Sequence, residues 1–270
     1  MAEASWRLKL QRAEKHFGEL DDLLVPYGEV NEYEVRESVE HKSNKRPMWV
    51  YRVFGMEPQP EFSIILGDFL FNVRSALDHI AVALVPSKRK DSASFPICTI
   101  DPHEIHSNDL KGDAARLRNW KTATEGTPSD ALAVIEFFQP YNAQPGDIYR
   151  GIKLLPEDTI LAVLSAFQNA DKHRRLVTTA SGLIPESVIL RRHDTGEVVP
   201  TELVVGPQHL GQNGAAVRLP YQVEVEAKGR TQIAASISKN ERGPYRRLPD
   251  LMIDTLSDAC RIIDALEACS

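Results

Sequence analysis

The chain has 270 residues, of which 42% are hydrophobic and 26% charged, a globular composition that excludes collagen-like, disordered and disulfide-scaffold proteins. Thirty-two Lys and Arg against 38 Asp and Glu leave a net charge of −6, so no overall positive field attracts nucleic acid or an anionic membrane. Cys98, Cys260 and Cys269 show no CxxC spacing, which indicates reduced thiols in a cytoplasmic protein. Residues 1–17 alternate charges and lack the apolar run of a signal peptide, so we expect no export.

In the first third of the chain, the hydrophobic pattern predicts two helices around a pair of strands. Apolar residues recur at steps of three and four over 5–25, which is typical of a one-faced helix. Alternating residues within 33–54 favour two strands joined by a charged loop. The 62–85 stretch is strongly apolar, but polar residues interrupt it too often for a membrane span. It is therefore predicted as a buried helix.

The remaining elements change from helix to strand and back to helix. Residues 86–127 are rich in Pro, Ser, Asp and Lys, which favours a long connection with short helical pieces. Helices are predicted at 131–138 and 157–176. Alternation within 185–239 predicts about four antiparallel strands, and 248–266 carries the apolar stripe of a C-terminal helix.

This order predicts an α+β fold, a helical bundle with an attached small antiparallel sheet. Residues 1–182 are expected to form a mainly helical bundle with an early hairpin. Residues 183–240 would form the antiparallel strands, and 246–270 a C-terminal helix that returns to the bundle.

Polar residues form an unusual pattern on the predicted helix 62–85. Four of them, at steps of four, three and four, make one narrow stripe: Asp68, Asn72, Ser75 and His79. Arg74 and Asp78 lie four residues apart beside this stripe. Large apolar residues lie among them, so we expect another helix or a partner subunit to cover this side. Covered charges need partners, because an unpaired buried charge is costly.

The predicted helix 157–176 offers those partners. Its inner apolar stripe continues through Asp171 and Arg174, which we expect to face Arg74, Asp78 and His79 in one network. Asn169 and His173 are expected to project on the other side of that helix, flanked by Lys172 and Arg175.

Two interpretations of this network remain open. In the first it is structural and fixes the register of two helices, with Arg74 against Asp78 or Asp171, and Asp68 or Asn72 holding His79. In the second it is catalytic: His79 exchanges a proton near neutral pH, and Arg74 grips a phosphate with two donors. The second combination suits cleavage of RNA through its own 2′-hydroxyl, without a metal.

Several segments also resemble known proteins. FNVRSALDHIAVAL, SFPI, FFQPY and NADKHRRL resemble a widespread group of uncharacterised bacterial proteins with an N.RSALDH helix and a later N.DKHR helix. The Arg74-Ser-Ala-Leu-Asp-His79 segment is similar to the signature of the HEPN superfamily, helical bundles in which Arg and a nearby His mark a metal-independent ribonuclease site. The resemblance implies a toxin- or defence-type endoribonuclease that acts as a dimer. Arg74 would bind the scissile phosphate, His79 would act as acid or base, and Asp78 or Asn72 would orient the imidazole.

A function of another class is also open: a non-catalytic protein-binding or assembly module whose sheet binds another protein. His103 and His106 have metal-compatible spacing, but a solvated loop is favoured, and we expect no metal or other cofactor. The expected partners are RNA and a second copy of the chain, with no membrane binding and no DNA specificity. Basic residues of the C-terminal third would supply an RNA-binding patch if they gathered on one face: Arg191, Arg192, Arg230, Lys239, Arg242, Arg246 and Arg247.

Overall fold

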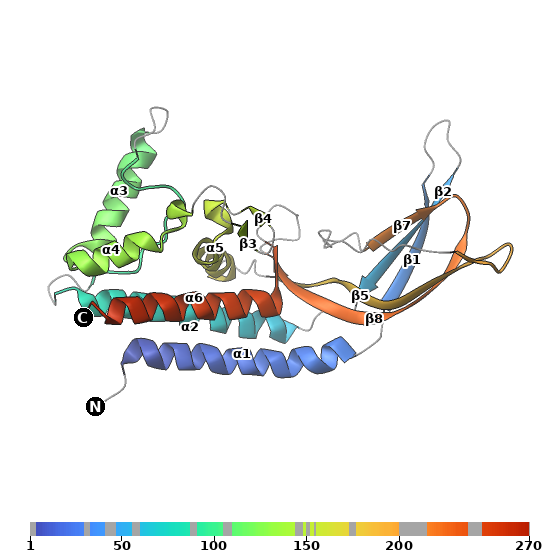
Figure 1. Ribbon diagram of the computed structural model, residues 1–270, viewed down its shortest axis with the longest axis horizontal. Helices are drawn as coiled ribbons and strands as arrows, with labels where there is room; N and C mark the ends of the chain where they lie inside the picture. The colour runs from blue at the N-terminus through green and yellow to red at the C-terminus, as the bar shows by residue number, and fades with distance from the viewer. Residues whose placement is uncertain are drawn as a thin grey trace. The chain divides into compact units, whose positions relative to one another are not determined.

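The computed structural model shows an α+β protein with six α-helices and small antiparallel sheets among its described residues, as predicted (Figure 1). The chain folds as two compact units, which we call the helical unit (Met1–Gly18, Ile65–Arg174 and Pro249–Ser270) and the sheet unit (Glu19–Ile64 and Arg175–Leu248). The structure describes residues 4–29, 33–40, 47–55, 60–86, 91–104, 110–143, 148–149, 152–153, 155–172, 177–199, 215–236 and 245–269.

Three long helices contribute to the helical unit: α1 (Ser5–Glu29), α2 (Pro60–Leu84) and α6 (Leu248–Glu267). The apolar stripe predicted for 62–85 is buried in α2, where Leu66, Phe69 and Val73 have no exposed surface. The stripe of α6 is likewise buried at Met252 and Ile263. Burial of each such side chain stabilises the fold by about 1.5–3 kcal/mol. Within the described residues, no helix combines the length and the apolar run that a membrane crossing needs.

The chain between α2 and the long strands is more helical than expected. It holds α3 (Leu110–Thr124) and α4 (Ser129–Phe137), and 110–124 was predicted to be a connection with only short helical pieces. α3 differs because tertiary burial of Trp120 anchors it, and because Arg116 pairs with Asp113 one turn away. A helix held by one buried aromatic leaves little periodic signal in the sequence.

The next helix begins later than its proline suggested. Pro156–Asp158 forms a 3₁₀ turn, η3, and α5 runs over Ile160–Lys172. Thr159 is extended, and its hydroxyl Oγ1 accepts a hydrogen bond from the Ala162 amide at 3.4 Å, so Thr159 caps the helix. Two short elements precede it, the 3₁₀ turn η2 (Pro140–Asn142) and the pair β3 (Ile148–Tyr149) and β4 (Ile152–Lys153).

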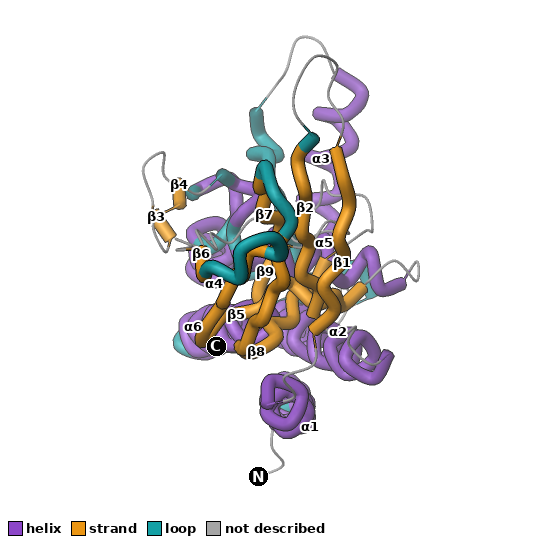
Figure 2. The backbone as a smooth tube through the Cα atoms, turned by 90° about the vertical axis from the view of Figure 1, so that its right-hand side faces the viewer, coloured by secondary structure: helices purple, strands orange, loops and turns teal. Residues whose placement is uncertain are grey.

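The sheet unit contains two antiparallel sheets (Figure 2). One has the order β1-β2-β7 and the other β6-β5-β8-β9. Their bounds are β1 (Tyr33–Glu40), β2 (Met48–Gly55), β5 (Val177–Arg192), β6 (Val198–Val199), β7 (Ala215–Leu219), β8 (Val223–Ser236) and β9 (Tyr245–Arg247). The hairpin β1–β2 pairs with β7, and the sheet unit groups it with the second part of α1 and the later strands. Backbone pairing decides this grouping, and alternation in the sequence does not reveal which strand pairs with which.

A small buried cluster joins the strands of the sheet unit. Tyr51 of β2, Leu190 of β5 and Val223 of β8 are 1–3% exposed. The Tyr51 hydroxyl accepts a hydrogen bond from the Val223 amide at 2.7 Å. Burial raises the pKa of Tyr51, and the paired hydroxyl lets this polar group lie inside the cluster. The long strands β5 and β8 pair around Pro185 through a register shift, which suits a residue that has no amide hydrogen.

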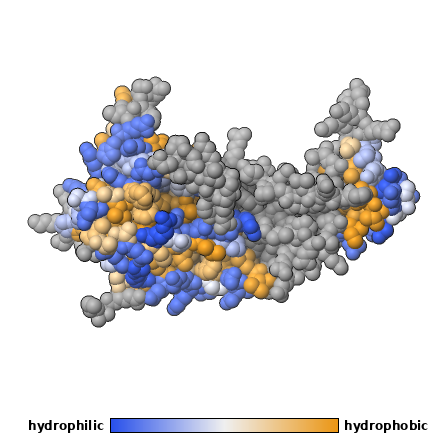
Figure 3. Space-filling view, in the orientation of Figure 1, coloured by the Kyte–Doolittle hydropathy of each residue, from blue (hydrophilic) through white to orange (hydrophobic). Residues whose placement is uncertain are grey.

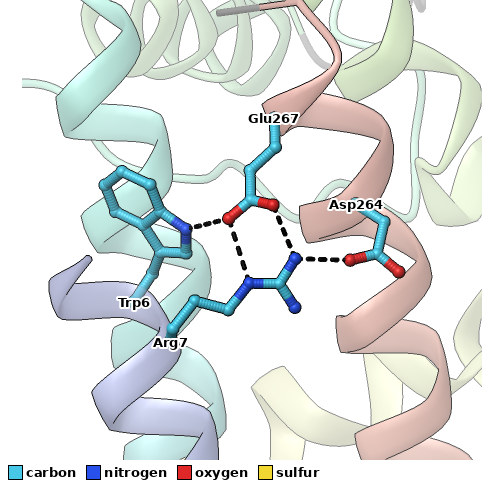
Figure 4. A network of polar contacts seen from close by, with 4 residues as sticks. All are labelled: Trp6, Arg7, Asp264 and Glu267. Atoms are coloured by element: carbon cyan, nitrogen blue, oxygen red, sulfur yellow. Dashed lines mark hydrogen bonds and ion pairs between the residues drawn. The ribbon is translucent and has the colours of Figure 1, made fainter. Parts of the chain in front are cut away.

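A polar network joins α1 to the end of α6 (Figure 4). Glu267 accepts hydrogen bonds from Trp6 Nε1 at 2.6 Å and from Arg7 at 3.0 and 2.5 Å. Arg7 Nη2 also lies 2.6 Å from Asp264 Oδ1. The hydrogen bond from Arg7 is the main reason that the pKa of Glu267 is lowered, because it favours the charged carboxylate. This network fixes the C-terminal helix to the first helix.

We expect Arg7→Gln and Glu267→Gln each to lower the free energy of unfolding by about 1 kcal/mol at neutral pH, because both remove the forked ion pair. Since the pKa of Glu267 is lowered in the folded state, its contribution is present above its ordinary pKa of 4.5 and is lost as the pH falls below that value. Thermal melting from about pH 6 to about pH 3 measures both effects. Arg12→Gln, on the exposed side of α1, is the matched control. Equal pH dependence in wild type and Glu267→Gln would contradict the assignment.

Candidate functional site

Arg74 and Asp78 form the ion pair that their spacing on α2 predicts. Arg74 Nε lies 3.2 Å from Asp78 Oδ2, and Nη2 lies 2.9 Å from Oδ1. The same Nη2 donates to the Phe95 carbonyl at 2.6 Å, and the Phe95 amide donates to Asp78 Oδ1 at 3.0 Å. The two side chains are 17% and 32% exposed. Together they satisfy both backbone polar groups of Phe95, whose side chain is fully buried.

Gln139 completes this arrangement from the end of α4. The side chain is buried, and its Nε2 donates to the Pro96 carbonyl at 2.9 Å and to the Ile135 carbonyl at 3.0 Å. Its Oε1 accepts a hydrogen bond from the Cys98 amide at 2.9 Å. The Cys98 carbonyl accepts from the Tyr141 amide at 3.1 Å. We call this set of contacts, made by Arg74, Asp78 and Gln139 to residues 94–98, the 94–98 clasp.

The clasp explains why three of the singled-out segments occur together. RSALD supplies the ion pair, SFPI the irregular backbone segment, and FFQPY the glutamine. An irregular segment does not satisfy its own amides and carbonyls as a helix does, and each unpaired buried group costs about 1–3 kcal/mol. The side chains of the clasp remove that cost. This agrees with the structural interpretation in which Arg74 pairs with Asp78.

His79 belongs to a different part of the helix surface. Its Nδ1 lies 3.1 Å from the Ser5 hydroxyl at the start of α1. Residues five apart on an α-helix are separated by about 140° around its axis, since each residue advances about 100°. Arg74 therefore reaches residues 94–98 while His79 reaches α1. Within one copy of the chain, the two side chains are not directed at a common phosphate.

The residues expected to orient the imidazole are engaged elsewhere. Asn72 is 7% exposed, and its Nδ2 donates to the Asp68 carbonyl of its own helix at 2.8 Å. The Asp68 side chain is exposed. Asp78 accepts from Arg74 and Phe95. The described hydrogen-bond partner of His79 is Ser5, and the expectation that Asn72 or Asp78 orients the imidazole stays a prediction.

The helix α1 covers only part of the polar stripe of α2. Lys9 Nζ lies 5.3 Å from the centre of the Phe71 ring, a cation–π contact. Phe71 nevertheless remains 50% exposed. The described contact at His79 is thus with α1, whereas the sequence favoured the helix 157–176, and the ring of Phe71 stays half-exposed.

The polar residues of α5 contribute little to the described site. Asn169 is exposed. Asp171 and Lys172 form the last residues of α5, and their side chains fall outside what the structure describes. His173 and Arg174 lie outside the described residues altogether. The network predicted between the two helices stays a prediction, and the described ion-pair partner of Arg74 is Asp78.

The other sequence candidates give no described metal or nucleic-acid site. His103 lies edge-on to Trp120 with ring centres 6.3 Å apart, and His106 is outside the described residues. In the described part of the chain, no group of three His, Cys, Asp or Glu is placed to hold a metal. Arg192 of the expected basic patch is paired with Asp194 at 2.7–2.9 Å. The guanidinium also lies 4.4 Å from the Tyr221 ring centre. Its described contacts are therefore with residues of its own sheet unit.

A cleft of about 840 Å³ in the helical unit is a feature that sequence reasoning missed. It lies between the end of α4 with η2, the start of α5, and α6. Phe137, 73% exposed, stands perpendicular to Phe138 with ring centres 5.1 Å apart. Three carboxylates also line it: Asp158, Asp254 and Asp258. Hydrophobic and strongly hydrophilic areas accordingly lie side by side on the helical part of the molecule (Figure 3).

One arginine lies within this acidic cleft. Arg261 Nη1 is 3.2 Å from Asp258 Oδ1, and its guanidinium lies 5.8 Å from the centre of the Phe138 ring. Burial raises the pKa of Asp258, although the nearby Arg261 opposes that shift. The cleft therefore combines an apolar floor, exposed aromatic surface and negative charge.

We expect Arg74→Ala and Gln139→Ala each to lower the free energy of unfolding by about 2–3 kcal/mol, because each leaves backbone or carboxylate groups of the clasp unpaired. Asp78→Asn keeps an oxygen for the Phe95 amide and should cost less, about 1 kcal/mol. Urea unfolding measures these differences. Arg118→Ala, at an exposed arginine of α3, is the control and should change the free energy by less than about 0.5 kcal/mol. A change that small in Arg74→Ala would contradict the clasp.

Burial in the clasp raises the pKa of the Cys98 thiol above its ordinary 9.0, and the charge of Asp101 adds to this. The thiolate is the reactive form, so Cys98 should react with a disulfide reagent more slowly than a small free thiol at about pH 8. The measurement uses Cys260→Ser/Cys269→Ser protein, in which Cys98 is the remaining cysteine. Adding Gln139→Ala should accelerate the reaction by releasing the Cys98 amide. Equal rates for Cys98 and the small thiol would show that the thiol is not shielded.

Relatives do not assign a role to either the clasp or the cleft. Comparison of the chain with protein-family models, with curated proteins and with solved structures finds no significant match. The function of the chain is therefore argued from the chemistry of its own described residues.

Proposed function

We propose that this protein is a non-catalytic protein-binding or assembly module whose Arg74–Asp78 pair is structural. One observation carries the proposal: the Arg74 guanidinium holds Asp78 and the Phe95 carbonyl at 2.6–3.2 Å. The same carboxylate holds the Phe95 amide. Both side chains of the apparent catalytic motif are thus used to satisfy a buried backbone segment.

The energy of the clasp opposes a phosphate at Arg74. To bind one with two donors, Arg74 would have to leave Asp78 or the Phe95 carbonyl, and each group left unpaired costs about 1–3 kcal/mol. A phosphate would also bring negative charge next to the Asp78 carboxylate, which repels it. The net charge of −6 adds no favourable field. The same groups instead rigidify the helical unit beneath its exposed surface.

The exposed surface of the helical unit supports a binding role. Phe137 and Phe71 are large apolar side chains that are 73% and 50% exposed. Exposed aromatic groups beside a cleft are typical of interaction sites, where their burial supplies affinity. The proposal places the module in the cytoplasm, in keeping with its three free cysteines.

A second candidate function, the metal-independent endoribonuclease, is favoured by one observation at His79. The imidazole is only partly buried, and its hydrogen bond to Ser5 uses Nδ1, so Nε2 is the ring nitrogen that serves proton transfer. The side chains of Arg74 and His79 point in different directions on α2. This candidate therefore needs a homodimer in which Arg74 of one copy and His79 of the other reach the same phosphate. RNA would be its substrate.

Incubation of the purified protein with single-stranded RNA in EDTA separates the two candidates. We expect no cleavage above that of a buffer blank by wild-type protein, Arg74→Lys or His79→Ala. His79→Ala is the informative variant, because its imidazole is outside the clasp and its loss should leave the melting temperature within a few degrees. Cleavage by the wild type that disappears in a folded His79→Ala protein would overturn the proposal and establish the ribonuclease.

A further inference from the structure

One face of α1 carries a regular stripe of exposed residues. Six of them follow one another at steps of three and four: Leu8, Gln11, Lys15, Gly18, Asp22 and Val25. This spacing places them on one side of the helix, as at the contact positions of a coiled coil. The buried residues Leu10, Ala13 and Leu20 lie on the opposite side. Figure 2, which shows α1 nearly end-on, has the other helices on one side of it. We call the exposed face the α1 stripe.

The apolar residues of the α1 stripe lie at its two ends. Leu8 is 50% exposed and Val25 is 56% exposed. A second copy of α1 that runs antiparallel, about a two-fold axis between residues 16 and 17, brings Leu8 of each copy opposite Val25 of the other. The symmetry makes this contact twice, once at each end. Antiparallel pairing therefore covers both apolar side chains that a single chain leaves in water.

The charges of α1 complement one another in the same arrangement. The exposed cations Arg12 and Lys15 precede Gly18, whereas the exposed anions Asp21 and Asp22 follow it. The helix dipole favours the reverse order, so the helix by itself gives no reason for this one. Within the described residues, none of these four side chains has an ion-pair partner. An antiparallel copy places the cationic half of one helix against the anionic half of the other.

Lys15 and Asp22 make the central contact of such a pair. Lys15 of one copy and Asp22 of the other are offset by about 6 Å along the helix axes. Side chains on a helix lean toward its N-terminus, so in an antiparallel pair these two lean toward each other. The length of the lysine side chain spans the offset. Each dimer thus contains two Lys15–Asp22 ion pairs.

Gly18 lies opposite Lys15 of the second copy. A Cβ atom at Gly18 would have no atom within 4 Å, so packing inside the chain gives no reason for a glycine. Glycine is also less favourable than alanine in the middle of a helix. Bare backbone at this position lets the alkyl chain of Lys15 from the second helix lie against it. Gly18 therefore supports the same pairing independently of charge.

From these features we propose that two copies of the chain associate through the α1 stripe, as an antiparallel pair in which Lys15 of each copy binds Asp22 of the other. This inference rests on the proposed function, which it deepens by making the chain an assembly module and its partner a second copy. The stripe is about 26 Å long, and one pair of such helices buries less than the about 1,200–2,000 Å² of a standard interface. We therefore expect a weak dimer, with a dissociation constant of about 10–100 µM.

This pairing does not assemble the ribonuclease site. α2 contacts α1 at Ser5 and Lys9, which lie away from the α1 stripe. The two α2 helices would therefore lie on the outer sides of the paired α1 helices. Arg74 of one copy and His79 of the other stay apart in this dimer, so association and RNA cleavage report on different surfaces.

Sedimentation equilibrium of the full chain from about 5 to 500 µM measures the association. Lys15→Glu and Asp22→Lys should each raise the dissociation constant about tenfold or more, because each variant places two like-charged pairs in the contact. An equimolar mixture of the two variants should associate with a dissociation constant within about threefold of the wild type, because opposite charges then face each other at both positions. The matched controls Lys111→Glu and Asp91→Lys reverse exposed charges outside α1 and should change the dissociation constant less than about twofold.

Three outcomes would overturn the proposal: a wild-type monomer throughout the concentration range, equal weakening by the control variants, or a mixture that stays monomeric. Thermal melting of each variant checks that it is folded. A monomeric wild type would leave the RNA assay unchanged, and RNA cleavage lost in His79→Ala would leave the association unchanged. Failure of this inference is therefore distinguishable from failure of the proposed function.

Discussion

Residues 94–98 form no regular secondary structure, and the side chains of Arg74, Asp78 and Gln139 bond the amides of Phe95 and Cys98 and the carbonyls of Phe95 and Pro96. The rest of the helical unit depends on this arrangement, because Phe95 can be fully buried only if its amide and carbonyl have partners. The same contacts fix α2 and the end of α4 to residues 94–98. This segment and the two helices therefore hold one another in place through side-chain hydrogen bonds and not through strand pairing.

This arrangement changes the meaning of an Arg–His motif on a helix. Arginine, aspartate and histidine are the residue types of phosphate and proton chemistry. Here the arginine and the aspartate bind each other and the backbone of Phe95. His79 faces α1 through Ser5 instead. Helical geometry makes this division unavoidable, since side chains five residues apart diverge by about 140° on a regular helix. The motif is therefore compatible with a structural role as well as with catalysis.

The C-terminal helix has two separate tasks in the helical unit. Its last turn holds α1 through Glu267 and Asp264, which accept hydrogen bonds from Trp6 and Arg7. Earlier turns line the acidic cleft with Asp254 and Asp258. The carboxylates that hold α1 and those that line the cleft thus come from a single amphipathic helix. Its buried stripe keeps both sets in position.

Periodicity along the chain is enough to predict the α+β class and the buried stripes of α2 and α6, and the four-residue spacing makes Asp78 one of two candidate partners of Arg74. Tertiary packing determines that Gln139 reaches the backbone near Cys98, that β2 pairs with β7, and that α6 lines the same cleft as Phe137. These contacts join residues far apart along the chain. Local pattern carries no information about such partners, since they depend on how whole elements are packed.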